Sequence, residues 1–335
     1  MRVTQAQVLC EGKRVLFAAT KQRSYLRNVQ ELSLLKQAAA RLDTAVSESP
    51  SYPRRVLLVW GRLLAGLLHP RYDVLFAGFS PQLVLPFLWL YRLRGSKVCI
   101  DFFVSVYDTL VDDRKKFSPR SLPARLCRWL DKATLAAADK VIVDTLADRD
   151  FFCVQFDKDA ADVDVLYLQA DTEIYRPLPA RRPDGRFVVL YFGSALPLQG
   201  VEVILDAARR LEHFPWVHFV LVGPFEKAFS VRPADHANAE FVPWLDQPDL
   251  ARAIAGADLC LAGHFSGSIG KASRTIAGKT YIYRAMGKPV ILGDNPANRE
   301  LFREDADTFF VPMGDGAALA ACIAARAKEA DHGTK

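Results

Sequence analysis

The sequence has no apolar run that is long enough to cross a bilayer. Its most apolar stretch, Leu83–Tyr91, is short and is followed by Arg92 and Arg94, whereas a membrane-spanning helix needs about 20 predominantly apolar residues. Residues 1–12 also lack the apolar segment of a secretory signal peptide. We therefore predict a cytoplasmic protein.

Cysteine is scarce and scattered. The six cysteines occur singly, without a CxxC pair or a histidine at the spacing of a zinc ligand. Cys99, Cys127 and Cys260 lie inside apolar runs, which is typical of small core residues. The sequence therefore predicts neither a disulfide framework nor a zinc site, and it favours a reducing compartment.

Positive charge is concentrated in the first part of the chain. Residues 1–130 contain 21 Lys and Arg against 9 Asp and Glu, a net charge of +12, and the remainder carries −6. Such a basic half suits an anionic membrane surface or an acceptor that carries phosphate; a merely solvated basic face is the simpler alternative. Because no Lys/Arg tract is interleaved with aromatic residues, we predict no nucleic-acid partner.

Strand-like and helix-like segments alternate along the chain, and no internal repeat is present. We predict strands at 14–18, 73–78, 97–103, 140–144, 163–168, 187–192, 218–222, 240–242, 258–262, 290–292 and 308–311. We predict helices at 28–41, 54–68, 81–94, 121–138, 147–156, 201–212 and 317–329. This alternation is typical of α/β domains with parallel sheets that are covered by helices on both faces.

The pattern predicts two Rossmann-like domains. Residues 1–172 form the first domain, and 173–186 form a linker within a segment rich in proline, arginine and aspartate. Residues 187–312 form the second domain, and 313–330 form a final helix, for which packing back toward the first domain is one option. No GxGxxG follows the first strand, where the turn reads Ala18–Arg23, so a dinucleotide oxidoreductase is disfavoured.

The segment Ile276–Ile291 is the most informative stretch for function. Gly278 and Lys279 precede a predicted helix that Gly287 stops, and the free N–H groups of a helix start suit a phosphate. Lys271, Arg274 and Lys279 lie within nine residues, so three cations are available to one anion. The alternative is an ordinary α/β crossover with solvated lysines.

Several motifs together resemble the retaining glycosyltransferases of the GT-B fold, and are similar to glycosyltransferase family 4. The motifs are Tyr191–Ala208, Ala257-Asp258 before an apolar strand, Gly278–Ile291 and Asn295–Phe302. The resemblance implies two Rossmann-like domains that face a central cleft, with the acceptor bound by the first domain and a nucleotide sugar by the second. It implies donor contacts from Gly193, Ser194, Gln199, Trp244, Lys271, Arg274, Lys279 and Glu300.

The chain also departs from the family pattern. The family commonly has two glutamates near the donor, and this sequence has Arg274 and Ile282 at those positions. The lysine of the family's loop falls on Gln199. These departures motivate a second hypothesis, in which a non-catalytic GT-B protein binds a nucleotide sugar or a partner. An epimerase of this fold is a third, although it is expected to have more acid/base residues.

The chemistry of sugar transfer assigns roles to particular residues. Lys271, Arg274 and Lys279 are the candidates to stabilise the diphosphate leaving group, with the backbone at Gly193 and Ser194 closing on the phosphates. Asp108, which follows a strand, is the candidate to orient or deprotonate the acceptor hydroxyl, although aspartate is equally common in turns and helix caps. Tyr25, Arg27 and Asn28 either touch a phosphate or cap the following helix.

We predict no metal and no cofactor beyond the nucleoside-diphosphate sugar, which is a co-substrate. Asp101, Asp108, Asp112 and Asp113 are carboxylates of the other domain from the proposed phosphates, whereas a divalent ion usually combines one or two carboxylates with the substrate phosphates. His264 is interpreted as a polar loop residue near the donor. The predicted acceptor is a glycan, a lipid-linked molecule or a small molecule, and the predicted location is the cytoplasm or the inner face of the membrane.

Overall fold

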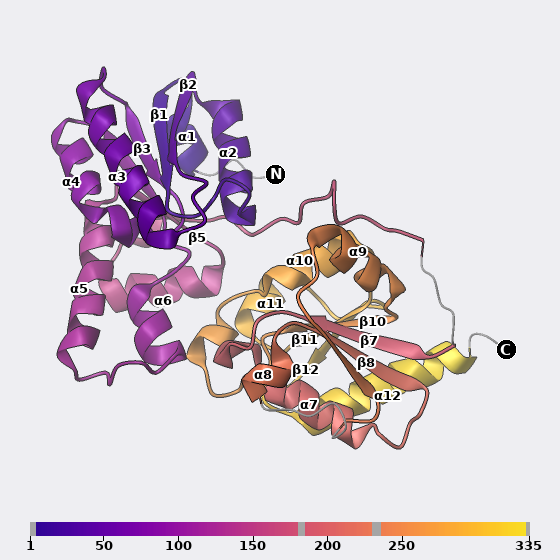
Figure 1. The fold of residues 1–335 in the computed structure, drawn as a ribbon. Coiled ribbons are helices and arrows are strands. Elements are labelled where there is room, and N and C mark those ends of the chain that lie inside the picture. Colours follow the sequence, from indigo (N-terminus) through magenta and orange to yellow (C-terminus); the bar gives the residue numbers. More distant parts are fainter. Residues whose placement is uncertain (1–4, 180–184, 230–235, 333–335) are drawn as a thin grey trace. The chain divides into compact units, whose positions relative to one another are not determined.

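The computed structural model describes residues 5–179, 185–229 and 236–332. The chain divides into two compact units, Met1–Leu168 and Gln169–Lys335, and each is built on a six-stranded sheet (Figure 1). The described residues of the predicted linker, 173–179 and 185–186, belong to the second unit. Part of it packs there, because Tyr175 is buried against that unit's core.

The first unit alternates strands and helices, as the sequence predicts. Its elements are α1 (Gln5–Cys10), β1 (Arg14–Ala19), α2 (Leu26–Ala38), β2 (Arg41–Val46), α3 (Tyr52–Leu68), β3 (Val74–Ala77), η1 (Pro81–Val84), α4 (Leu85–Leu93), β4 (Lys97–Asp101), η2 (Asp108–Asp113), α5 (Leu122–Ala137), β5 (Lys140–Val143), α6 (Leu146–Phe156), η3 (Ala160–Asp162) and β6 (Val163–Val165). The strands pair in parallel in the order β2-β1-β3-β4-β5-β6.

Helices cover both faces of this sheet. Along β1, Leu16 and Ala18 face a core built with α3, α4, α5 and α6, whereas Val15 and Phe17 face a smaller core with α1 and α2. This alternation follows from the two-residue period of a strand. Because both faces are covered, the central strands are apolar almost throughout.

The strand β2 is missing from the sequence-based prediction, which extends the preceding helix to residue 41. In the structure α2 ends at Ala38 and β2 starts at Arg41. β2 is an edge strand, and its residues Arg41, Asp43 and Thr44 are exposed or half-buried. It therefore lacks the continuous apolar run by which the central parallel strands can be recognised.

The second unit has a matching architecture. Its elements are β7 (Phe187–Phe192), η4 (Pro197–Gln199), α7 (Val201–Arg210), β8 (Val217–Val222), α8 (Phe225–Phe229), β9 (Ala239–Val242), α9 (Gln247–Gly256), β10 (Leu259–Gly263), η6 (Gly270–Ser273), α10 (Gly278–Ala285), β11 (Val290–Gly293), α11 (Pro296–Leu301), β12 (Thr308–Val311) and α12 (Gly316–His332). Its parallel strands are ordered β12-β11-β10-β7-β8-β9. Both units are therefore Rossmann-like.

Two layers of helices cover the second sheet. Val201 and Ile204 of α7 pack with Leu319 and Ile323 of α12 on one face, and α9 and α10 cover the other face. The final helix thus packs on α7, β7 and β12 of its own unit. None of the helices within the described residues combines the length and the apolar character that a membrane span requires.

Candidate functional site

The strand order of the second sheet reverses between β7 and β10. Open α/β sheets bind ligands beyond the carboxyl ends of the strands at such a point. Gly193 follows β7, and Gly263 ends β10. A Cβ atom on Gly193 would lie 3.0 Å from the Nζ atom of Lys279, and one on Gly263 would lie 3.4 Å from it. Lys279 therefore reaches the reversal point through space that these glycines leave open.

A second close approach positions Gln199 at the same place. Gly200 has a φ of +64°, and a Cβ atom there would lie 2.4 Å from the backbone nitrogen of Ser266, so glycine is required. The N–H of Phe265 donates to the carbonyl oxygen of Gln199 at 3.1 Å. The loop after β7 is thereby held against the loop after β10, with the side chain of Gln199 close to Gly263.

Lys279 is a buried cation whose hydrogen-bond partners among the described residues are neutral. It is 6% exposed, and its ammonium group donates to the hydroxyl of Tyr191 at 3.2 Å and to Oε1 of Gln199. The Nζ atom also lies 4.3 Å from the centre of the Tyr191 ring. Among the described residues no carboxylate forms an ion pair with it, and burial lowers the pKa of Lys279 to about 7.

The helix α10 carries Lys279 in its first turn. The sequence places Gly278 and Lys279 ahead of the helix, but α10 begins at Gly278, after Ala277 at its N-cap. The positive end of the helix dipole therefore lies beside the ammonium group, and both features favour an anion. The buried Tyr283 anchors the helix, because its hydroxyl accepts the N–H of Phe192 at 3.3 Å.

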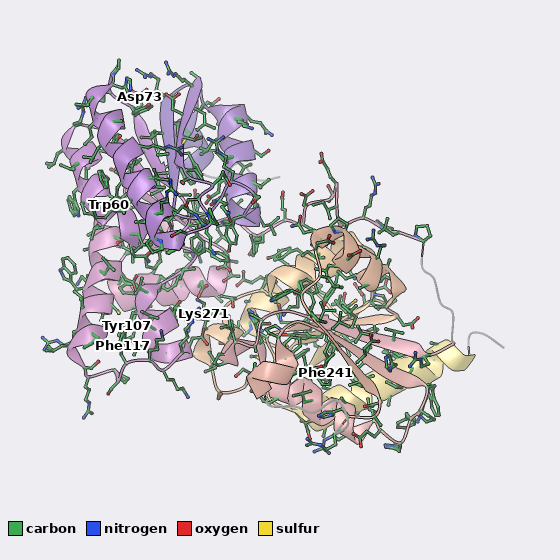
Figure 2. The ribbon with its side chains drawn as sticks, in the orientation of Figure 1. Trp60, Asp73, Tyr107, Phe117, Phe241 and Lys271 are labelled. Carbon is green, nitrogen blue, oxygen red and sulfur yellow. The ribbon has the colours of Figure 1, made fainter. Side chains whose placement is uncertain are left out.

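Lys271 and Arg274 lie on the short turn η6 and directly after it. Figure 2 shows Lys271 on the segment between β10 and α10. The N–H of Arg274 donates to the carbonyl oxygen of Lys271 at 3.1 Å, and both side chains are half-buried. The turn packs on η4 through Leu198, Ile269 and Ala272, so it is held against the loop that carries Gln199.

His264 connects these cations electrostatically. It is buried, and its Nδ1 atom lies 3.1 Å from the hydroxyl oxygen of Thr275. Burial first, and then the charge of Lys279, lower the pKa of His264 to about 3; the hydrogen bond with Thr275 opposes this shift, and the charge of Lys271 adds to it. His264 is therefore neutral at pH 7.

The other sequence-based candidates of the second unit lie at different depths. Ser194 follows Gly193 and is half-buried, and Glu300 is half-buried on α11. Trp244 is 57% exposed and follows β9, the edge strand that β8 separates from β7. Ile282, at a position where the family has a glutamate, is partly buried against the apolar core.

In the first unit, Asp108 begins the π-helical turn η2 and is 2% exposed. The approach to this turn is fixed by Asp131 of α5, which is fully buried. Its carboxylate accepts the hydroxyl of Ser105 at 2.7 Å and the N–H groups of Val106 and Tyr107 at 3.0 and 2.8 Å. The hydroxyl of Ser105 in turn accepts the N–H of Asp108 at 3.0 Å.

The structure corrects the phosphate hypothesis for Arg27 and Asn28. Arg27 is fully buried, and its Nε atom donates to Asp101 at 2.8 Å. Asn28 is fully buried as well, and its amide donates to the carbonyl oxygens of Lys21 and Gln22. Both side chains thus form hydrogen bonds inside the first unit. The sequence shows that cations lie near a strand end, but it does not show which of these cations pairs with a buried carboxylate.

The sequence analysis also missed residues at the reversal point of the first sheet, between β1 and β3. The hydroxyl of Thr20 donates to the carbonyl oxygen of Phe79 at 3.0 Å, and the ammonium group of Lys21 lies 5.4 Å from the ring of Phe79. Ser80 has a φ of 57°, which is uncommon for a residue other than glycine. The sequence Phe79-Ser80-Pro81 directly after a strand is the signal that could have marked this edge.

Metal ligands do not gather in the part of the chain that the structure describes. No group of three or more His, Cys, Asp or Glu side chains there is placed to hold a metal ion. The cysteines are all free, and Cys10, Cys99, Cys127 and Cys260 are buried.

Comparisons with known proteins agree with this architecture. Residues 186–328 match the family model described as glycosyl transferases group 1. A search of curated proteins found no match. Among solved structures, the chain is similar to HepE of Anabaena in complex with UDP, with a TM-score of 0.66 and 16% sequence identity over 95% of this chain and 90% of that one.

Two further solved structures have the same arrangement. Sucrose-phosphate synthase of Thermosynechococcus elongatus gives a TM-score of 0.63 with 16% identity over 94% of this chain and 91% of that one. The lipopolysaccharide outer core galactosyltransferase WaaB, in its apo form, gives 0.58 with 12% identity over 94% and 90%. The protein therefore has the GT-B glycosyltransferase fold, and its second unit matches the group 1 glycosyltransferase family over residues 186–328.

Proposed function

We propose that this protein is a glycosyltransferase that moves a sugar from a nucleoside-diphosphate sugar to an acceptor hydroxyl, with retention at the anomeric carbon and without a metal. We further propose that the nucleotide sugar is a co-substrate and that no other cofactor takes part. Support comes from the match of residues 186–328 and from the similar HepE, whose solved structures include complexes with UDP and with UDP-glucose.

The observation that carries the proposal is the environment of Lys279. A buried ammonium group is unfavourable unless it is paired with an anion, and the described contacts of this one are a phenol and an amide. It lies at the reversal point of the strand order and at the start of α10. A diphosphate at that place would supply the negative charge that Tyr191 and Gln199 do not.

The proposed reaction uses these groups at the leaving group. The bond between the anomeric carbon and the β-phosphate oxygen breaks, and the diphosphate gains negative charge as a new bond forms to the acceptor oxygen. Lys279, Lys271 and Arg274 stabilise that charge, and the backbone at Gly193 and Ser194 lies against the phosphates. Fixed cations and N–H groups that face a developing charge lower the barrier without reorganising during the reaction.

We assign the acceptor to the first unit. Asp108 is proposed to orient the acceptor hydroxyl or take its proton, with the turn η2 held in place by Asp131. We propose a glycan, lipid-linked or small-molecule acceptor, and a location at the inner face of a membrane. The excess of positive charge in residues 1–130 supports an acceptor that is presented on an anionic surface.

A second candidate function is supported by Ile282 and Gln199. Ile282 packs against the apolar core where the family has a carboxylate, and Gln199 lies where the family has a lysine. A protein with this fold that binds the nucleotide sugar but transfers nothing would show both features. Turnover of the donor distinguishes the two functions, because the binding protein would leave a nucleotide sugar intact.

The test combines binding with turnover. We expect UDP to bind the wild-type protein in calorimetry, and Lys279→Met to weaken that binding by about tenfold to a hundredfold, since a hydrogen bond to a charged group is worth about 1.5–3 kcal/mol. Arg274→Gln should weaken it in the same direction. Sugar transfer should fall further, by about 10²–10³, because the charge is largest in the transition state.

Two matched variants control for general damage. Lys288→Met removes a lysine whose ammonium group donates to the carbonyl oxygens of Ala255 and Ala257, and Arg284→Gln removes an exposed arginine of α10. Both should leave UDP affinity unchanged. Equal UDP affinity of wild type, Lys279→Met and Arg274→Gln would remove the donor site from this position. Binding without turnover of any nucleotide sugar would support the second candidate.

A further inference from the structure

The helices α3, α4 and α5 of the first unit expose large apolar side chains. Leu68 is 89% exposed, Leu93 82% and Leu122 75%. With them we define the α3–α5 face, whose apolar members are Leu57, Leu64, Leu68, Trp89, Leu90, Leu93, Leu122, Leu126 and Trp129, all exposed. A soluble monomer rarely exposes a large continuous apolar patch unless the patch binds something.

The residues of this face share one side of each helix. They occupy positions 57, 64 and 68 of α3, positions 89, 90 and 93 of α4, and positions 122, 126 and 129 of α5. On α3, Tyr52, Leu58 and Trp60 are exposed as well but lie outside this line. On α3 this outer line lies opposite Val59 and Leu63, which are fully buried in the core. The helix therefore has one apolar face for the fold and a second apolar face that the fold does not use.

Direct contacts place the three helices side by side. The indole N–H of Trp60 on α3 donates to the carbonyl oxygen of Leu83 at 2.8 Å, and its ring packs on Phe87 of α4 at 5.4 Å. Arg92 of α4 donates to the carbonyl oxygen of Ala137 on α5 at 2.9 Å. Figures 1 and 2 show these helices in one layer of the first unit, with Trp60 at its margin.

The charge on this layer has one sign. Every residue of α3, α4 and α5 is described, and their one carboxylate, Asp131, is buried. The exposed cations of the three helices are Arg54, Arg62, Arg92, Arg125, Arg128 and Lys132. The segment that leads into α5 adds exposed Arg114, Lys115, Lys116 and Arg120. These three helices thus expose leucine and tryptophan together with arginine and lysine.

We propose that the α3–α5 face seats the protein on an anionic lipid bilayer. Leucine and tryptophan side chains gain by entering the boundary between headgroups and acyl chains, and tryptophan is favoured at that depth. Arginine and lysine beside them bind the acidic headgroups. An acidic protein partner would satisfy the cations as well, but exposed apolar residues and cations occur on all three helices, which matches an extended surface.

This inference deepens the proposal of a membrane-surface acceptor and names the face that docks. It rests on the exposed side chains of the first unit and not on Lys279 or its surroundings. Its test therefore measures lipid binding without any sugar transfer. Binding to vesicles without binding to UDP would support this inference and contradict the proposed function. Binding to UDP without binding to vesicles would contradict this inference and leave the proposed function supported.

The experiment is flotation of the full chain with vesicles of phosphatidylcholine alone or mixed with phosphatidylglycerol, at low and high salt. We expect binding to the mixed vesicles that weakens as salt rises. The charge variant Arg125→Gln/Arg128→Gln/Lys132→Gln should lose about a hundredfold in vesicle affinity, since each cation near an anionic surface contributes about fivefold. The apolar variant Leu64→Gln/Leu93→Gln/Trp129→Gln should lose at least as much.

Two control variants change the same residue types elsewhere. Val154→Gln/Trp216→Gln/Leu301→Gln alters exposed apolar residues outside the face, and Lys13→Gln/Arg209→Gln/Arg303→Gln removes three exposed cations outside it. Both should float with the vesicles as wild type does, and circular dichroism should show all variants folded. Absence of wild-type binding, or equal losses in face and control variants, would overturn the proposal. The proposal would also be overturned if the wild-type protein did not bind vesicles, was a dimer in light scattering, and became a monomer in the apolar variant.

Discussion

Lys279 has a free-energy cost in the protein without ligand. Its ammonium group is buried between the ring of Tyr191 and the amide of Gln199, and burial lowers its pKa from 10.5 to about 7. Between pH 7 and 10.5 the unfolded chain therefore binds more protons at this lysine than the folded chain, so its contribution makes stability rise with pH in that window. Below pH 7 the full cost is present.

A bound diphosphate should reverse this shift, which gives a pH-dependence to measure. The anion favours the charged lysine, so above pH 7 binding of UDP should be accompanied by uptake of a proton. We expect UDP affinity to fall by about tenfold for each pH unit between roughly pH 7.5 and 8.5. Isothermal titration calorimetry in buffers of different ionisation enthalpy measures both the affinity and the proton uptake.

The variant Lys279→Met serves as the comparison for this pH series. Its weaker UDP affinity should not fall steeply with rising pH, because the variant lacks the ammonium group that takes up the proton. A wild-type affinity that stays constant over the same pH range, with no proton uptake, would show that Lys279 does not neutralise the diphosphate.

Individual residues differ in how far the sequence could predict them. The position of Lys279 near a helix start follows from local spacing. Its contacts with Tyr191 and Gln199 span 88 and 80 residues of sequence, and they depend on the order of strands in the sheet. Arg27 shows the same limit of local sequence patterns. Its ion pair with Asp101 spans 74 residues of sequence, and it occupies the guanidinium group that the sequence offered to a phosphate.

At the scale of elements, apolar runs predict the buried strands well and the polar edge strand poorly. The central strands β3, β10 and β11 are buried at every residue, and the sequence shows them as short apolar stretches. β2 is exposed at its start and looks like the tail of a helix. The π-helical turn Asp108–Asp113 has no periodic signal, because it is fixed by contacts with α5.

That turn supports a prediction about Asp131. Asp131→Asn replaces a carboxylate oxygen that accepts N–H or O–H groups with an amide that donates, so buried donors from Ser105–Tyr107 or Gln82 lose their partner. We expect a loss of about 1–3 kcal/mol in the free energy of unfolding. Sugar transfer should fall with little change in UDP affinity, because the second unit is unchanged. Urea unfolding and calorimetry measure the two effects.

Asp108→Asn and Asp73→Asn complete this comparison. Asp108→Asn should lower transfer without weakening UDP binding if the carboxylate acts on the acceptor. Asp73 precedes β3 and accepts the N–H of Arg14, the first residue of β1, at 2.9 Å. Asp73→Asn therefore tests an aspartate at the start of the strands, away from the turn, and should leave transfer intact. A loss of transfer in Asp73→Asn as large as in Asp131→Asn would indicate that general destabilisation, not the turn, is responsible.

For the whole molecule, the alternation of strands and helices predicts two α/β units. Each unit needs its own parallel sheet with helices packed on both faces. The structure shows separate cores, one around Leu63 and Leu88 and another around Ile204 and Phe219. Net charge is also unevenly divided, with +12 in residues 1–130 and −6 in the remainder. Composition can indicate that division, whereas the apolar outer faces of α3, α4 and α5 become apparent only once the helices are placed on their sheet.

Separate cores lead to the prediction that the units unfold in distinguishable steps and that nucleotide stabilises one of them. Leu63→Ala and Ile204→Ala, both at fully buried positions of different cores, should each destabilise one unit by about 2–5 kcal/mol and so assign the two transitions in scanning calorimetry.

UDP at about a hundred times its dissociation constant stabilises its unit by about 2.7 kcal/mol. We therefore expect a rise of about 5–10 °C in the transition that Ile204→Ala lowers. A single transition that both variants lower equally would contradict independent cores, and a UDP shift confined to the transition that Leu63→Ala lowers would place the nucleotide in the first unit.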